Sequence, residues 1–192
     1  KELRLLGYRD SGMAGTPANN HPDAFWRANF DEAVRSMVKH IRELKPHVIV
    51  TYDAFGAYGH PDHIQAHRVT RAAFEAASDP RCYQDLELEA WQPAKLYYTA
   101  IRHEDIAEIN PEFKGTPDEL ITARIDIRPY FDTKLAAFRV HKTQIAPDEF
   151  FFSMSADLQE RLLGYEHFIL AVQKQGKVSS EQENDLFYGL HS

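Results

Sequence analysis

The feature that most constrains the fold is a β-branched run that a glycine-containing loop joins to an amphipathic segment. Residues 47–52 (His-Val-Ile-Val-Thr-Tyr) lack polar alternation at their centre, which is typical of a parallel strand buried on both faces. Pro61, whose fixed φ suits a first helical turn, opens a helix predicted to continue through Ala77. Ligands bind beyond the carboxyl ends of such strands, so a site is expected in the loop 53–59.

Other patterns extend this unit into an alternation of strands and helices. Apolar residues recur every three or four positions between residues 25 and 44, which predicts a helix that Pro46 closes. Further strands are expected at 3–7, 95–100 and 121–127, and further helices at 129–144 and 158–163, whereas 165–172 is apolar enough for either state. The order predicts an α/β protein with a mostly parallel sheet, folded as a single domain over residues 1–192.

The composition argues against several classes of protein. The formal charge is −7 and lysines and arginines form no run, so nucleic acid is not an expected partner. No stretch approaches the roughly 20 apolar residues of a membrane helix, and residues 1–6 are too short and too charged for a signal peptide. These features favour the cytoplasm. The single cysteine, Cys82, is interpreted as a plain exposed thiol without a role.

Residues 52–63 gather two imidazoles, two carboxylates and two phenols. His63 and His67 are one helical turn apart and share a face, an arrangement that can bind zinc or simply stack at a surface. A histidine ligand needs its other ring nitrogen held by a carboxylate or a carbonyl, and Asp53 and Asp62 are candidates for that role. Backbone N–H groups at the start of the helix would also favour a developing negative charge.

Residues 58–63 (Tyr-Gly-His-Pro-Asp-His), preceded by Val-Thr-Tyr-Asp at 50–53, resemble the second signature of the LmbE/PIG-L deacetylases. Shorter matches support the resemblance across nearly the whole chain: residues 9–15 (Arg-Asp-Ser-Gly-Met-Ala-Gly), 134–144 ending His-Lys-Thr-Gln, 166–168 (Glu-His-Phe) and 183–187 (Glu-Asn-Asp-Leu-Phe). The family resemblance implies a Rossmann-like three-layer α/β/α sandwich. It also implies a divalent metal, usually zinc with Fe²⁺ as an alternative, and hydrolysis of the acetamide of an N-acetylglucosaminyl conjugate.

The resemblance carries roles to particular positions. His63 matches the metal ligand, and His60 matches the histidine that stabilises the oxyanion or protonates the leaving amine. Tyr58 matches a tyrosine that hydrogen-bonds the tetrahedral intermediate, and Asp62 the carboxylate that tunes the neighbouring histidine. The remaining matches are the sugar-pocket residues Asp10 and Met13, while His67 and Asp53 are expected to support the site without touching the metal.

The chain also departs from the family pattern. The first family motif, His-Pro-Asp-Asp-Glu, supplies two more metal ligands and the general-base aspartate, and it does not occur in the 192 residues. Residues 21–24 (His-Pro-Asp-Ala) lack the second aspartate and are interpreted as a cap of the helix that follows. Ala57 stands where many relatives have glycine, which restricts the loop.

Because a catalytic zinc has three protein ligands, we expect roughly a third of the protein to lie outside this sequence. The strand 47–52 should then have an edge that the missing part pairs. Two alternatives share these features: an amidase of thiol S-conjugates, and a catalytically inactive sugar-binding subunit. The expected partner is a small amino-sugar substrate, with no membrane association and with homo-oligomerisation left open.

Overall fold

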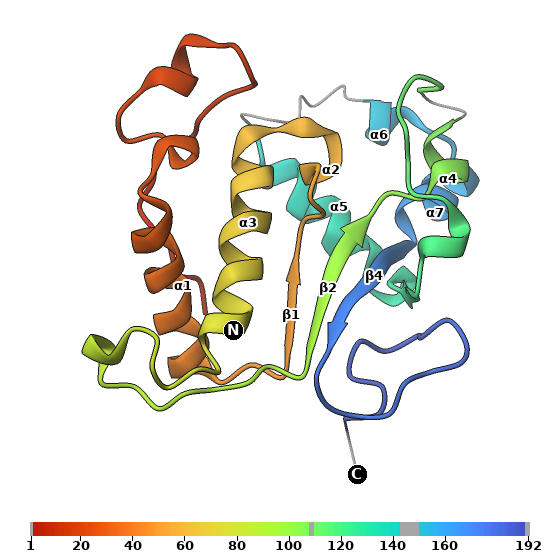
Figure 1. Ribbon diagram of the computed structural model, residues 1–192. Helices are drawn as coiled ribbons and strands as arrows, with labels where there is room; N and C mark the ends of the chain where they lie inside the picture. Colours follow the sequence, from red (N-terminus) through yellow and green to blue (C-terminus); the bar gives the residue numbers. More distant parts are fainter. Residues whose placement is uncertain (1, 108–109, 143–149, 191–192) are drawn as a thin grey trace. The chain divides into compact units, whose positions relative to one another are not determined.

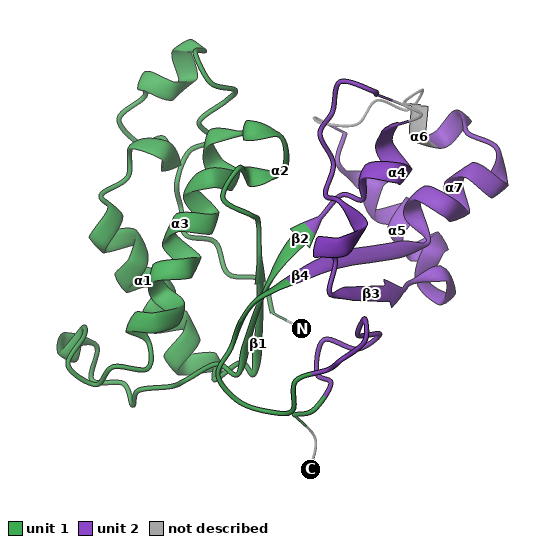
Figure 2. Ribbon diagram, turned by 45° about the vertical axis from the view of Figure 1, so that its right-hand side comes forward, with its two compact units in different colours: residues 1–99, 170–178, 189–192 green, residues 100–169, 179–188 purple. Residues whose placement is uncertain are grey.

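The computed structural model describes residues 2–107, 110–142 and 150–190, and the chain folds into two compact units (Figure 2). Unit 1 comprises residues 1–99, 170–178 and 189–192, and unit 2 comprises residues 100–169 and 179–188. The α-helices are α1 (Phe30–Leu44), α2 (Gly56–Gly59), α3 (Pro61–Ala76), α4 (His103–Ala107), α5 (Phe131–Val140), α6 (Phe150–Ser153) and α7 (Ala156–Leu163). The strands are β1 (Val48–Thr51), β2 (Lys95–Ala100), β3 (Ala123–Asp126) and β4 (Tyr165–Gln173), hydrogen-bonded in the order β1-β2-β4-β3.

Helix α1 begins later than its apolar pattern predicts. The side chain of Asn29 accepts a hydrogen bond from the backbone N–H of Glu32 and so caps the helix, while Phe25–Arg27 forms a separate 3-10 turn. The prediction that residues 21–24 cap this helix is therefore wrong. Ala24 is instead fully buried and forms a single β-bridge with Arg9.

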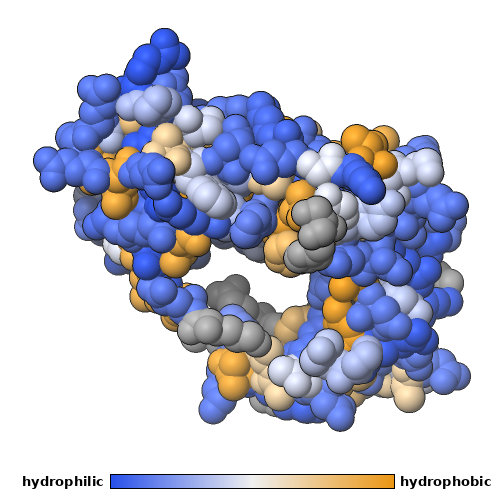
Figure 3. Space-filling view, turned by 90° about the horizontal axis from the view of Figure 1, so that it is seen from below, coloured by the Kyte–Doolittle hydropathy of each residue, from blue (hydrophilic) through white to orange (hydrophobic). Residues whose placement is uncertain are grey.

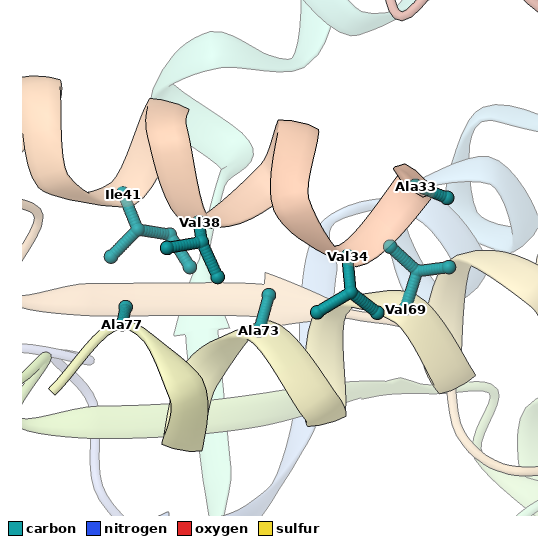
Figure 4. Packing of buried hydrophobic residues seen from close by; sticks show 7 residues of the cluster. All are labelled: Ala33, Val34, Val38, Ile41, Val69, Ala73 and Ala77. Atoms are coloured by element: carbon teal, nitrogen blue, oxygen red, sulfur yellow. The ribbon is translucent and has the colours of Figure 1, made fainter. Parts of the chain in front are cut away.

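The core of unit 1 lies between α1 and α3. Figure 4 shows small and branched side chains of α1 facing those of α3 and its C-cap residue: Ala33, Val34, Val38, Ile41, Val69, Ala73 and Ala77. The alanines of α3 let the two helix backbones approach closely, and the branched residues of α1 fill the space above them. This packing fixes the position of α3, whose first turn carries the histidine motif.

The predicted strands β1 and β2 are both present and pair in parallel, with Val48 opposite Lys95 and Thr51 opposite Tyr98 (Figure 1). Among the described residues β1 has no other strand beside it, so it is an edge strand. Val50 is 43% exposed, and the expectation that this strand is buried on both faces is wrong for that reason. The open edge is the arrangement expected if another strand completes the sheet there.

Unit 2 contains the antiparallel pair of β3 with β4, in which Ala123 lies opposite Phe168. The ambiguous segment 165–172 is thus a strand, and the predicted strand 121–127 is present but shorter. The helix expected over residues 129–144 begins as a 3-10 turn, continues as α5 and ends at Val140. Thr143 and Gln144 of the family motif lie outside the described residues. The α/β class is confirmed, with parallel and antiparallel pairs in one sheet.

The strand predicted over residues 3–7 does not form. Leu3 and Leu5 are 83% and 82% exposed, and no described strand lies alongside them. A short apolar run becomes a strand only where a neighbour satisfies its backbone groups, so the pattern alone was insufficient.

Polar side chains cover most of the surface in view in Figure 3, with smaller hydrophobic areas between them. Among the described helices, none combines the length and the apolar character that a membrane crossing requires.

Candidate active site

The loop after β1 folds back over the first turn of α3. The carboxylate Oδ1 of Asp53 accepts a hydrogen bond from the Ala57 N–H at 2.9 Å, and its carbonyl accepts one from the Gly56 N–H at 3.0 Å. Ala57 has φ 63° and ψ −59°, a conformation that costs a non-glycine residue on the order of 1–3 kcal/mol. The loop therefore holds backbone strain at Ala57.

His60 is the N-cap of α3, and its ring is oriented by that role. Its Nδ1 accepts a hydrogen bond from the backbone N–H of Asp62 at 3.2 Å. Because a backbone N–H can only donate, Nδ1 must carry the lone pair, and the proton of the neutral ring is on Nε2. The ring of Tyr58, which is 48% exposed, lies edge-on to this imidazole with its centroid 6.1 Å away.

His63 has the opposite orientation. Its Nδ1 lies 3.2 Å from the carbonyl oxygen of Gly56, which can only accept, so Nδ1 carries the proton and Nε2 the lone pair. The imidazole stacks on Tyr52, with ring centroids 3.9 Å apart, and meets Tyr58 edge-on at 5.0 Å. Burial lowers the pKa of His63 below its ordinary value, more than the Gly56 hydrogen bond raises it, and so favours the neutral ring.

His67 lies one turn further along α3. Its Nδ1 donates to the carbonyl of Tyr52 at 2.9 Å, and its ring meets Tyr98 at 4.9 Å. Backbone carbonyls thus hold the second ring nitrogens of both His63 and His67, and the expectation that Asp53 or Asp62 holds them is wrong. The reason is that the loop turns its carbonyls towards α3, while the Asp53 carboxylate is used within the loop.

Ser11 holds the carboxylate of Asp62 by two hydrogen bonds, although the sequence pattern predicted no role for Ser11. The Ser11 N–H donates to Oδ2 of Asp62 at 2.9 Å, and the Ser11 hydroxyl donates to Oδ1. The N–H of Trp26 donates to Ser11 Oγ at 2.9 Å, which directs the hydroxyl proton towards Asp62, and Ser11 is fully buried. Ser11 lies inside the family match at residues 9–15, but its contact spans 51 positions of sequence, which no local pattern reveals.

The loop that carries Ser11 also brings Asp10 to the site. Asp10, His60 and Asp62 each offer one possible metal-ligand atom, and these atoms lie within 4.8 Å of one another. His63, the ligand that the family resemblance implies, is not part of this group, although its ring centroid is 5.0 Å from that of His60. Met13 is 46% exposed in the turn after Asp10.

Two solved structures share the fold. The conserved protein TT1542 from Thermus thermophilus matches with a TM-score of 0.54 at 18% identity, over 90% of this chain and 66% of the other. The N,N'-diacetylchitobiose deacetylase from Pyrococcus horikoshii also matches with a TM-score of 0.54, at 17% identity, over 76% of this chain and 53% of the other. The chain therefore spans two thirds or less of these proteins, and at such identities the likeness concerns the fold.

Sequence comparison gives the family. Residues 1–74 match the family described as PIG-L, GlcNAc-PI de-N-acetylase. A 1D-myo-inositol 2-acetamido-2-deoxy-alpha-D-glucopyranoside deacetylase from Geodermatophilus obscurus is 44% identical, over 98% of this chain and 71% of the relative. The corresponding deacetylase 2 from Frankia alni is 42% identical over 216 residues, which cover 98% of this chain and 73% of the relative. With this identity over most of both sequences, the chain belongs to the LmbE/PIG-L deacetylase family.

Proposed function

We propose that this protein is a metal-dependent N-deacetylase that hydrolyses the acetamide of an N-acetylglucosaminyl conjugate of a cyclitol. The relatives whose names specify this substrate share more than two fifths of their aligned residues with the chain, which supports the proposal. Products would be acetate and the free amino sugar.

The observation that carries the proposal is the opposite protonation of two neighbouring imidazoles. His63 presents an unprotonated Nε2 and His60 a protonated one, as their backbone partners dictate. A metal ligand needs the lone pair, whereas a group that supports an oxyanion or protonates a leaving amine needs the proton. One loop and one helix cap thus supply both kinds of nitrogen.

His63 fits a metal ligand by its carbonyl-held Nδ1 and its neutral ring. Zinc, the usual metal of the family, would polarise the attacking water and the amide carbonyl when bound. The Asp10, His60 and Asp62 group is the competing set, but His60 uses Nδ1 in the helix cap and Asp62 accepts hydrogen bonds at both oxygens. We assign the metal to His63 and propose that residues outside this sequence, of the His-Pro-Asp-Asp-Glu type, complete its ligands.

The other side chains would bind the substrate and position the groups that take part in the reaction. In this proposal the Nε2–H of His60 donates to the developing oxyanion or to the leaving nitrogen, and Tyr58, which is 48% exposed, donates its hydroxyl to the same intermediate. Asp62, held by Ser11, fixes the first turn of α3, so that the cap at His60 keeps its geometry. Asp10 and Met13 line the approach of the sugar in this proposal.

The test uses the protein together with the segment that carries the first motif. Acetate release is measured with N-acetylglucosaminyl-inositol, with an S-conjugated thiol amide and with zinc removed by a chelator. The proposal expects release from the sugar conjugate that zinc restores after chelation. Turnover of the thiol amide alone would favour the S-conjugate amidase, and zinc-loaded protein that binds the sugar without releasing acetate would favour the inactive binding subunit.

A further inference from the structure

A cavity of unit 1 lies on the far part of the loop that carries Asp10. Its volume is about 480 Å³, within the roughly 300–1,000 Å³ of small-molecule sites. The residues that line it come from the turn, the 3-10 helix Pro17–Asn20 and the turn before α1: Gly15, Thr16, Asn19, Asn20, Trp26 and Arg27. None of them has a role in the proposed chemistry.

The lining has the chemistry of a site for a polyhydroxylated ring. Trp26 is 39% exposed, and the face of an indole ring accepts the C–H face of such a ring. Arg27 and Asn20 are exposed, and neither side chain has a hydrogen bond or an ion pair with any residue in the described ranges. Their guanidinium and amide groups are therefore free to bond ligand hydroxyls.

The cavity is tied to the proposed active site by hydrogen bonds. The backbone N–H of Trp26 donates to Ser11 Oγ, and the backbone N–H of Ser11 donates to Asp62 Oδ2. These two hydrogen bonds, each of 2.9 Å, connect the cavity wall to the first turn of α3. Asn19 donates to the carbonyls of Gly12 and Met13 at 3.1 Å each and fixes the turn between cavity and site. Gly15 lies five positions after Asp10, so at most about 18 Å of chain separates the cavity wall from the sugar-pocket residue.

We infer that this cavity binds the cyclitol of the substrate, with Trp26 against the ring face and Arg27 and Asn20 donating to its hydroxyls. The inference rests on the proposed function and adds the place where the part of the substrate remote from the acetamide is recognised. A substrate that lacks the cyclitol makes none of these contacts. The cavity should therefore contribute to selectivity between conjugates and not to the chemical step.

The first experiment compares two substrates. Arg27→Met and Asn20→Ala should each lower kcat/KM for N-acetylglucosaminyl-inositol by about tenfold, as expected for one lost hydrogen bond, mainly through KM. The same variants should leave methyl N-acetylglucosaminide unchanged. Lys39→Met, which removes an exposed charge from α1, is the matched control and should affect neither substrate. Equal losses on both substrates, or no loss on either, would overturn the inference.

A binding experiment keeps the inference testable if no deacetylation is found. In a Trp91→Phe background Trp26 is the sole tryptophan of the chain, and its fluorescence is followed while myo-inositol is added. A saturable change that Arg27→Met weakens about tenfold supports the cyclitol site, whatever the activity. No saturable change, or saturation with inorganic phosphate but not with myo-inositol, would contradict it.

Discussion

Replacing Gly56 by alanine tests whether close backbone approach holds His63 in place. Gly56 is buried with φ +67°, and a Cβ at this position would meet His63 Cβ and Ile64 N, each at 2.8 Å. Neither atom can swing away, because one is the root of a side chain and the other is backbone. The loop or the first turn of α3 must therefore shift.

The matched control is Gly7→Ala. Gly7 has φ +82°, but nothing lies within 4 Å of the position that an alanine methyl group would occupy there. Both substitutions share a left-handed backbone penalty of about 1–2 kcal/mol, offset by about 0.4–1 kcal/mol from the stiffer unfolded chain. Only Gly56→Ala adds overpacking, about 1–3 kcal/mol. The difference between the two free energies of unfolding should therefore be about 1–3 kcal/mol.

Urea denaturation followed by circular dichroism measures this difference, and a zinc titration of the protein with its first motif measures the consequence for the site. Because Gly56 supplies the carbonyl that holds His63, its displacement should weaken zinc binding by about 10–100-fold, the usual effect of losing a partner that orients a ligand. Equal destabilisation in both variants, with zinc affinity unchanged in Gly56→Ala, would refute the close-approach argument.

Three further predictions concern the ends of α3 and one histidine of unit 2. Arg42→Leu should lower the free energy of unfolding by about 2–4 kcal/mol, because the buried guanidinium of Arg42 donates to carbonyls at the end of α3. Arg81→Leu is the control: this side chain is 85% exposed, so the free energy of unfolding should fall by less than about 1 kcal/mol. The midpoints of urea denaturation check both variants. His63→Ala should abolish tight zinc binding, while His60→Ala should keep the metal and lower turnover by about 10²; equal metal loss would show that their roles are wrongly assigned. Burial lowers the pKa of His167 below 6.5, so the unfolded chain binds a proton at this imidazole more tightly than the folded chain does. The free energy of unfolding should therefore fall as the pH drops below about 6.5. His167→Phe should flatten this pH dependence in urea titrations between about pH 5 and 8, and an unchanged pH dependence would contradict the argument.

Local patterns predicted two elements almost to the residue. The proline-initiated helix was predicted through Ala77 and observed to Ala76, and β2 was predicted with its observed bounds. The run at 3–7 and the segment at 165–172 have similar apolar content, yet only the second is a strand, because β3 lies beside it. Whether an apolar run forms a strand thus depends on a partner that the run itself does not encode.

The same limit applies within the candidate site. Residues 58–63 are adjacent in sequence, and their pattern was enough to single out His60 and His63. The hydrogen bonds from Ser11 to Asp62 join segments 51 positions apart in the sequence, and they form only because the fold brings the loop to the start of α3. The carbonyl partners of the histidines are backbone groups, which carry no signature in the sequence at all.

Helix initiation and the proposed chemistry are coupled through His60. Serine, threonine, asparagine and aspartate are the usual N-caps, and a histidine is an uncommon choice for a role that a smaller side chain performs as well. At this position the cap bond also removes the choice between two tautomers, since accepting the Asp62 N–H leaves the proton on Nε2. A His60→Asn variant would preserve the cap but not the Nε2–H donor, so stability and catalysis should separate in it. His63, three residues on, is held in the other tautomer by a carbonyl of the preceding loop. The backbone at the start of α3 therefore gives two identical side chains opposite tautomers, a protonated Nε2 in His60 and an unprotonated Nε2 in His63, which the composition of the motif alone does not distinguish.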